Sequence, residues 1–149
     1  MNPSDADVAL ISHVIQLSVA PVFLITGVGA LLSVMATRLA RVVDRARFLE
    51  GAWRTMVEAE RGSAGKELDV LRRRAYLASW AINFAAISAL LVCLVIAALF
   101  IDAMIGGTRL RWFVASLFIF SMVSLIAAVA CFLREVYLAT HTLKIGPPG

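Results

Sequence analysis

Residues that commonly carry catalysis are few in this sequence, and their spacing does not combine them into a site. Two histidines, His13 and His141, lie near opposite ends of the 149-residue chain. The topology argued below places them on opposite sides of a membrane. The sequence has no metal-ligand spacing, no glycine-rich phosphate loop and no nucleophile elbow. We therefore expect no enzyme, with no catalytic residue, no metal ligand and no cofactor.

The remaining polar and small residues of interest lie in apolar sequence. Hydrophobic residues make up 61% of the chain and charged residues 16%, and the mean hydropathy is +0.88. A soluble domain of this size needs a more polar surface. Three apolar stretches, residues 14–36, 75–101 and 111–133, each have about the 20 residues that a spanning helix needs. The sequence therefore predicts an all-α membrane protein with three transmembrane helices.

The first apolar stretch is the most polar of the three. Gly29, Ser33 and Thr37 recur every fourth residue, and such a stripe of small residues lets another helix approach closely in lipid. In the second stretch, a buried Asn83 amide needs hydrogen-bond partners, and we expect them in the backbone near Gly29. Two interpretations stay open for the whole set, helix packing and the lining of an oligomeric pore. The set consists of Gln16, Ser18, Thr26, Gly27, Gly29, Ser33, Thr37 and Asn83.

Basic residues begin where the first apolar stretch ends. Ten of the 14 Lys and Arg residues lie between Arg38 and Arg74. The positive-inside rule therefore predicts an N-terminus outside, residues 38–74 in the cytoplasm and a cytoplasmic C-terminus. This rule also accounts for the basic charge without a nucleic-acid partner. Arg38, Arg41 and Arg45 are candidates for contact with anionic lipid or another anion, although a role as topology signals explains them equally well.

The basic segment also has helical spacing. Its apolar residues at alternating intervals of three and four are Leu39, Val42, Ala46, Leu49, Trp53 and Met56. This seam predicts that the first helix continues to about residue 60. The glycines of residues 61–65 (RGSAG) predict a turn, after which Leu68 and Leu71 face back toward the seam.

These elements define the predicted architecture. We expect a cytoplasmic helical hairpin, or stalk, over residues 38–74 between the first and second spans. The hairpin belongs to a single membrane domain over residues 1–149, with a disordered tail at about 144–149.

Two segments resemble a known family. They are IQLSVAPVFLITGVGALLSVMATRLARVVDRARFLE (residues 15–50) and ELDVLRRRAYLASWAI (residues 67–82). Their APVFL-x-TG-x-G and RLAR-x-VDRAR motifs are similar to those of the bacterial membrane family known as domain of unknown function 2721. The resemblance covers almost the whole chain except its termini. It implies a multi-pass protein of the bacterial inner membrane, and it brings no catalytic residue, substrate or cofactor.

Two classes of function stay open. The interiors of the predicted spans hold no charged residue, which argues against an ion-coupled pump. Three helices are too few to enclose water, so a channel requires several subunits, and the small-residue stripe and the stalk seam predict a homo-oligomer. The first class is a passive ion-conducting channel lined by the first span. The alternative is a non-conducting structural or accessory subunit that binds a larger membrane complex or organises lipid.

Overall fold

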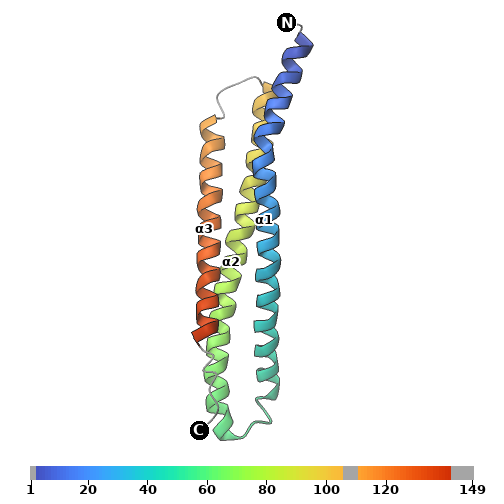
Figure 1. The fold of residues 1–149 in the computed structure, drawn as a ribbon. Coiled ribbons are helices and arrows are strands. Elements are labelled where there is room, and N and C mark those ends of the chain that lie inside the picture. Colours follow the sequence, from blue (N-terminus) through green and yellow to red (C-terminus); the bar gives the residue numbers. More distant parts are fainter. Residues whose placement is uncertain (1–2, 106–110, 142–149) are drawn as a thin grey trace. The chain divides into compact units, whose positions relative to one another are not determined.

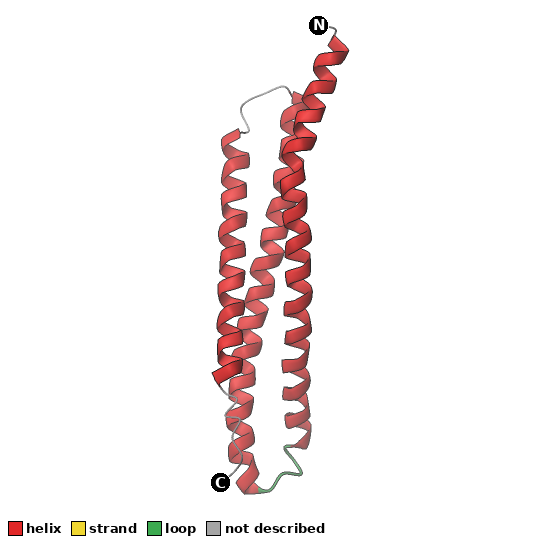
Figure 2. Ribbon diagram, in the orientation of Figure 1, coloured by secondary structure: helices red, strands yellow, loops and turns green. Residues whose placement is uncertain are grey.

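The computed structural model describes residues 3–105 and 111–141, which form three α-helices. Helix α1 covers Pro3–Ala52, α2 covers Glu58–Ile105 and α3 covers Arg111–His141 (Figure 1). The described residues contain helix and loop but no strand (Figure 2). The prediction of an all-α chain is confirmed.

Each helix contains a segment that is long and apolar enough to cross a membrane. These candidate spans are Val19–Ala52, Glu60–Met104 and Trp112–Thr140. Each overlaps one of the predicted spans, so three membrane-spanning helices are supported by length and composition. One boundary differs, because the predicted second span ends at residue 101, whereas α2 continues to Ile105 and includes Asp102 in its last turn. The predicted tail at 144–149 lies outside the described residues.

The chain divides into two compact units. Unit 1 contains residues 1–32 and 84–126, and unit 2 contains residues 33–83 and 127–149. In unit 1, serine hydroxyls join α2 and α3. Ser121 Oγ donates to the Ser88 carbonyl at 3.1 Å, and Ser124 Oγ donates to the Phe84 carbonyl at 2.8 Å. Ser88 and Ser121 are fully buried, so these polar groups are satisfied inside the unit.

In unit 2, the C-terminal part of α1 packs antiparallel to the N-terminal part of α2. Val42, Leu49 and Leu71 form a buried cluster, against which Ala46, Met56, Leu68 and Ala75 pack. The cluster includes both α2 leucines expected to face back and most of the α1 seam. A helix pair of this kind is stabilised mainly by the burial of its apolar stripe. Its location in the cytoplasm stays a prediction.

The predicted position of the turn between these helices is wrong. Helix α1 ends at Ala52 and α2 begins at Glu58, so residues 61–65 lie inside α2. The reversal occurs at residues 53–57, where the Thr55 backbone amide donates to the Ala52 carbonyl at 3.0 Å. Acidic residues in the first turn of α2, Glu58 and Glu60, favour a helix start there.

Of the two glycines in this stretch, Gly65 lies next to the reversal. A Cβ added to Gly65 would lie 3.7 Å from Trp53 Cη2, and the neighbouring Ala64 is buried. Small residues here let the reversing chain return close to α2. Composition alone predicts a turn from the same residues, because glycine is both a small residue and a helix breaker.

The helical conformation of residues 61–65 predicts the effect of replacing Gly62. Nothing lies within 4 Å of a Cβ added at this position, so Gly62→Ala meets no steric obstacle. We expect the free energy of unfolding to rise by about 1 kcal/mol, because alanine favours a helix interior over glycine. Gly62→Pro is the matched variant in the opposite direction and should lower the free energy of unfolding by about 2 kcal/mol. Denaturant titration of the protein in mixed micelles measures both changes, and a turn at 61–65 would tolerate the proline instead.

Candidate functional site

The site is built around a carboxylate on α3. Among the described residues, Glu135 is the one charged side chain in the buried core, and 1% of it is exposed. Arg74 of α2 donates two hydrogen bonds to Glu135 Oε1, from Nε at 3.0 Å and from Nη2 at 2.9 Å. Arg38 of α1 places Nη2 3.1 Å from Glu135 Oε2. One carboxylate therefore joins all three helices within unit 2.

The electrostatics of this cluster favour a charged, fixed carboxylate. A buried ion costs several kcal/mol unless it is paired and hydrogen-bonded, and here two guanidinium groups share one acid. The Arg38 guanidinium also lies over the Phe132 ring, 5.4 Å from its centroid, in cation–π geometry. Exposure of the side chains is 20% for Arg74 and 35% for Arg38, so Arg74 makes the drier contact. A carboxylate placed between two guanidinium groups in this way positions the helices.

A second ion pair lies farther along α1 and α2 and differs in burial. Arg45 Nε lies 2.8 Å from Glu67 Oε1, and Arg45 Nη2 lies 3.3 Å from Glu67 Oε2. About half of each side chain is exposed, 51% and 43% respectively. Exposed pairs of this kind contribute roughly 0–1 kcal/mol. The pair shows which residues of the two antiparallel helices face each other, and it adds little to their stability.

The structure separates the three arginines that were predicted to contact lipid or an anion. Arg38 and Arg45 are engaged by Glu135 and Glu67. Arg41 is exposed, and within the described part of the chain no ion pair or hydrogen bond involves it. Among these three arginines, only Arg41 has a guanidinium that no carboxylate of the described chain engages.

The predicted pore or packing residues of α1 lie on its exposed surface. Their small side chains leave space around them, since nothing lies within 4 Å of a Cβ added to Gly27 or Gly29. The hydroxyl of Thr26 donates to the Val22 carbonyl, and that of Thr37 to the Ser33 carbonyl. The side chain of Ser18 lies outside the described part of the structure. The exposed members of the set are Gln16, Thr26, Gly27, Gly29, Ser33 and Thr37.

Asn83 is not the buried amide that the sequence predicted. Its side chain is exposed, and no hydrogen bond among the described residues involves it. Ala81 and Ala85 on the same helix are fully buried. A residue two positions away on an α-helix points to the opposite side, which turns Asn83 outward. The expected bond to the backbone near Gly29 stays a prediction.

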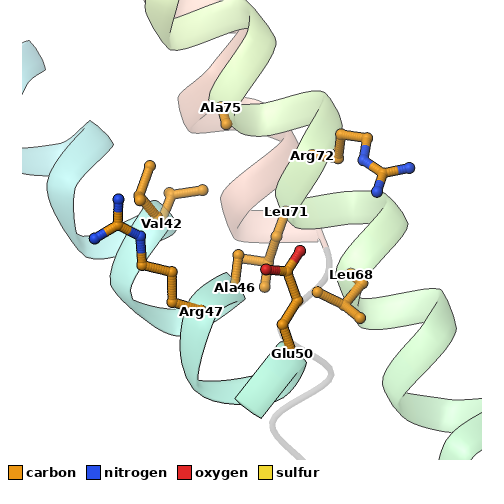
Figure 3. A pocket seen from close by; sticks show the side chains of 9 residues that line it. Val42, Ala46, Arg47, Glu50, Leu68, Leu71, Arg72 and Ala75 are labelled. Atoms are coloured by element: carbon orange, nitrogen blue, oxygen red, sulfur yellow. The ribbon is translucent and has the colours of Figure 1, made fainter. Parts of the chain in front are cut away.

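An open groove of about 190 Å³ lies between α1 and α2 in unit 2 (Figure 3). Its floor is apolar and its rim is charged, and Figure 3 shows Arg47 and Arg72 extending away on either side. No described group of three or more His, Cys, Asp or Glu side chains is placed to hold a metal ion. The apolar residues that line the groove are Val42, Val43, Ala46, Leu68, Leu71 and Ala75.

Neither Glu135 nor Arg74 was among the site residues predicted from the sequence. A signal for them exists, because Arg38, Arg74 and Glu135 stand at corresponding ends of the three predicted spans. Charges at the same depth on neighbouring helices are expected to pair when the helices pack. Spacing along the sequence alone cannot reveal this, since Glu135 is distant from both arginines in the chain.

Comparison with known proteins gives one match. A family model described as "Protein of unknown function (DUF2721)" matches residues 18–145. No curated protein and no solved structure matches the chain. The matched region includes Arg38, Arg74 and Glu135.

The ion pairs of Glu135 with Arg38 and Arg74 predict a large loss of stability for Glu135→Gln. The amide has nearly the shape of the carboxylate but leaves two guanidinium groups without a counter-charge. We expect the free energy of unfolding to fall by about 3 kcal/mol, as for other buried ion pairs that lose one partner. Denaturant titration of the protein in mixed micelles measures this change in the free energy of unfolding.

Glu67→Gln is the matched control, because it removes an acid from an exposed pair. We expect a loss below about 1 kcal/mol. Arg74→Gln should also cost more than Arg38→Gln, since Arg74 is drier and donates both hydrogen bonds. Equal small losses for Glu135→Gln and Glu67→Gln would contradict the role assigned to the cluster.

Proposed function

We propose that this chain, which belongs to the DUF2721 family, is a non-catalytic, multi-pass protein of the bacterial inner membrane that assembles as a homo-oligomer. The proposed topology has the N-terminus outside and both residues 38–74 and the C-terminus in the cytoplasm. Its support is the concentration of ten basic residues between Arg38 and Arg74. The one described buried carboxylate is neutralised by two arginines, which suits a structural role.

The proposed contact between subunits rests on a difference between helices: the serines of α2 and α3 bond within the chain, whereas the small residues of α1 are exposed. In unit 1, the serines of α2 and α3 hydrogen-bond inside the chain. On α1, by contrast, the stripe of Gly29, Ser33 and Thr37 is exposed. Small residues on a lipid-facing surface gain little from lipid, but they admit a second helix at close range. This favours α1 as the helix that contacts a neighbouring copy.

One observation favours a passive ion-conducting channel among such assemblies. The exposed polar and small positions of α1 extend from Gln16 to Thr37. At 1.5 Å per residue this is about 30 Å, which matches the thickness of the hydrocarbon core. A ring of α1 helices would thus present hydroxyls, an amide and glycine backbone along the whole membrane, as pore linings do.

The groove between α1 and α2 favours the alternative, a non-conducting accessory subunit. The groove lies in the segment proposed to be cytoplasmic, and an apolar floor with a charged rim suits the apolar stripe of a partner helix. A subunit of this kind would bind a larger membrane complex without conducting ions. The two functions differ in the number of copies that they require.

The mass of the detergent-solubilised particle, measured by native mass spectrometry, tests the proposal. We expect a closed ring of four or more identical subunits that gives ion flux in liposomes. Gly29→Leu should abolish the ring and the flux, because the larger side chain prevents close helix approach. Ala130→Leu is the control, since Ala130 is an exposed small residue in the predicted third span. A monomer, a dimer or a complex with a different protein would exclude the channel.

A further inference from the structure

The arginines of unit 2 fall into two groups. Arg38, Arg45 and Arg74 are paired with acidic residues of other helices. Arg47, Arg54 and Arg134 are exposed, and in the described chain no ion pair or hydrogen bond involves their side chains. The same is true of Arg41, Arg72 and Arg73. The nearest acids along the chain, Asp44 and Asp69, are exposed and form no described ion pair with them. The second group therefore has charge that the protein itself leaves uncompensated.

The alignment of α1 and α2 places three of the unpaired arginines, Arg41, Arg72 and Arg73, at a similar level along the two helices. The Arg45–Glu67 pair and the contact cluster of Val42 and Leu71 define how α1 and α2 align. In this alignment, Arg41 lies at the level of Leu71, and Arg72 and Arg73 follow after one and two residues, roughly 1.5 and 3 Å farther along α2. Figure 3 shows the Arg72 side chain extending away from α1, toward the outside of the helix pair.

The depth of this layer matches lipid phosphate. Arg41 lies three residues beyond Arg38, about 4.5 Å farther along α1, and the predicted spans end at residue 36 and begin at residue 75. The head-group region extends roughly 5–7 Å beyond the hydrocarbon core on each side. Unpaired guanidinium groups at this depth face phosphate oxygens, which they bind through two parallel hydrogen bonds.

We infer that Arg41, Arg72 and Arg73 form a binding surface for the phosphate of anionic phospholipid head groups. The paired layer of Arg38, Arg74 and Glu135 lies next to it and holds the three helices in place. The inference rests on the proposed topology only for the choice of leaflet, which would be the cytoplasmic one. Lipid binding itself requires neither the ring nor the channel.

Native mass spectrometry of the full chain in detergent, titrated with phosphatidylglycerol or phosphatidylcholine, tests this surface. We expect the wild type to prefer phosphatidylglycerol, with a preference that weakens as salt rises. The triple variant Arg41→Gln, Arg72→Gln and Arg73→Gln should bind phosphatidylglycerol roughly 100-fold more weakly, at the strength expected for three basic residues at a membrane surface.

The control variant removes the same charge elsewhere. Arg47→Gln, Arg54→Gln and Lys66→Gln replace three exposed basic residues that lie farther from the predicted spans. We expect their combined effect to stay within about threefold, because the attraction falls off within a Debye length of the membrane. An equal loss in both triple variants would show a general charge effect and overturn the site.

Two further outcomes decide the question without any variant. Equal affinity of the wild type for both lipids would overturn the inference. So would displacement of phosphatidylglycerol by inorganic phosphate at equal concentration, since the ligand would then be the free anion. The mass of the same particles reports the number of subunits, so failure of the lipid site and failure of the proposed oligomer are separate results.

Discussion

The pairing of Glu135 with Arg38 and Arg74 is the constraint on which the rest of unit 2 depends. A buried carboxylate must keep its counter-charges, so α1, α2 and α3 are held at one register where they meet it. Turning Arg38 and Arg74 inward toward α3 turns the neighbouring positions of the same helices outward. Arg72 and Arg73 therefore face the surroundings, because they stand one and two positions from Arg74 on α2. The exposure of Arg41 does not follow from this geometry, since residues three apart share one side of a helix.

Local pattern was enough to predict the helices but not the place where the chain reverses. The three long apolar stretches and the spacing of Val42, Leu49 and Leu71 are properties of neighbouring residues, and they predicted which elements form and which sides meet. At the reversal, Trp53 of the connection lies beside Gly65 of α2, a contact across the turn that the pattern of neighbouring residues does not contain. Asn83 likewise points outward because Ala81 and Ala85 occupy the contact side of α2.

The candidate site shows the same limit more strongly. From the sequence, Arg38, Arg41 and Arg45 were all candidates for the same role, contact with anionic lipid or another anion. In the structure their environments differ. Arg38 pairs with Glu135 of α3, Arg45 pairs with Glu67 of α2, and Arg41 has no partner among the described residues. Which arginine forms an ion pair inside the protein depends on acidic residues that are distant in the sequence. Charge composition predicts the side of the membrane but cannot separate paired from unpaired arginines.

The ion pairs of Glu135 with Arg38 and Arg74 also restrict how a conducting assembly of these subunits would open. Moving α1 against α3 at this level would pull Arg38 away from Glu135 and leave a buried carboxylate with one partner, at a cost of several kcal/mol. A pore lined by α1 would therefore open by movement of the α1, α2 and α3 segments of unit 2 as one rigid group. Sliding of α1 alone is the unfavourable path. The lining residues of such a pore would change their contacts across subunits, at the exposed stripe of Gly29, Ser33 and Thr37.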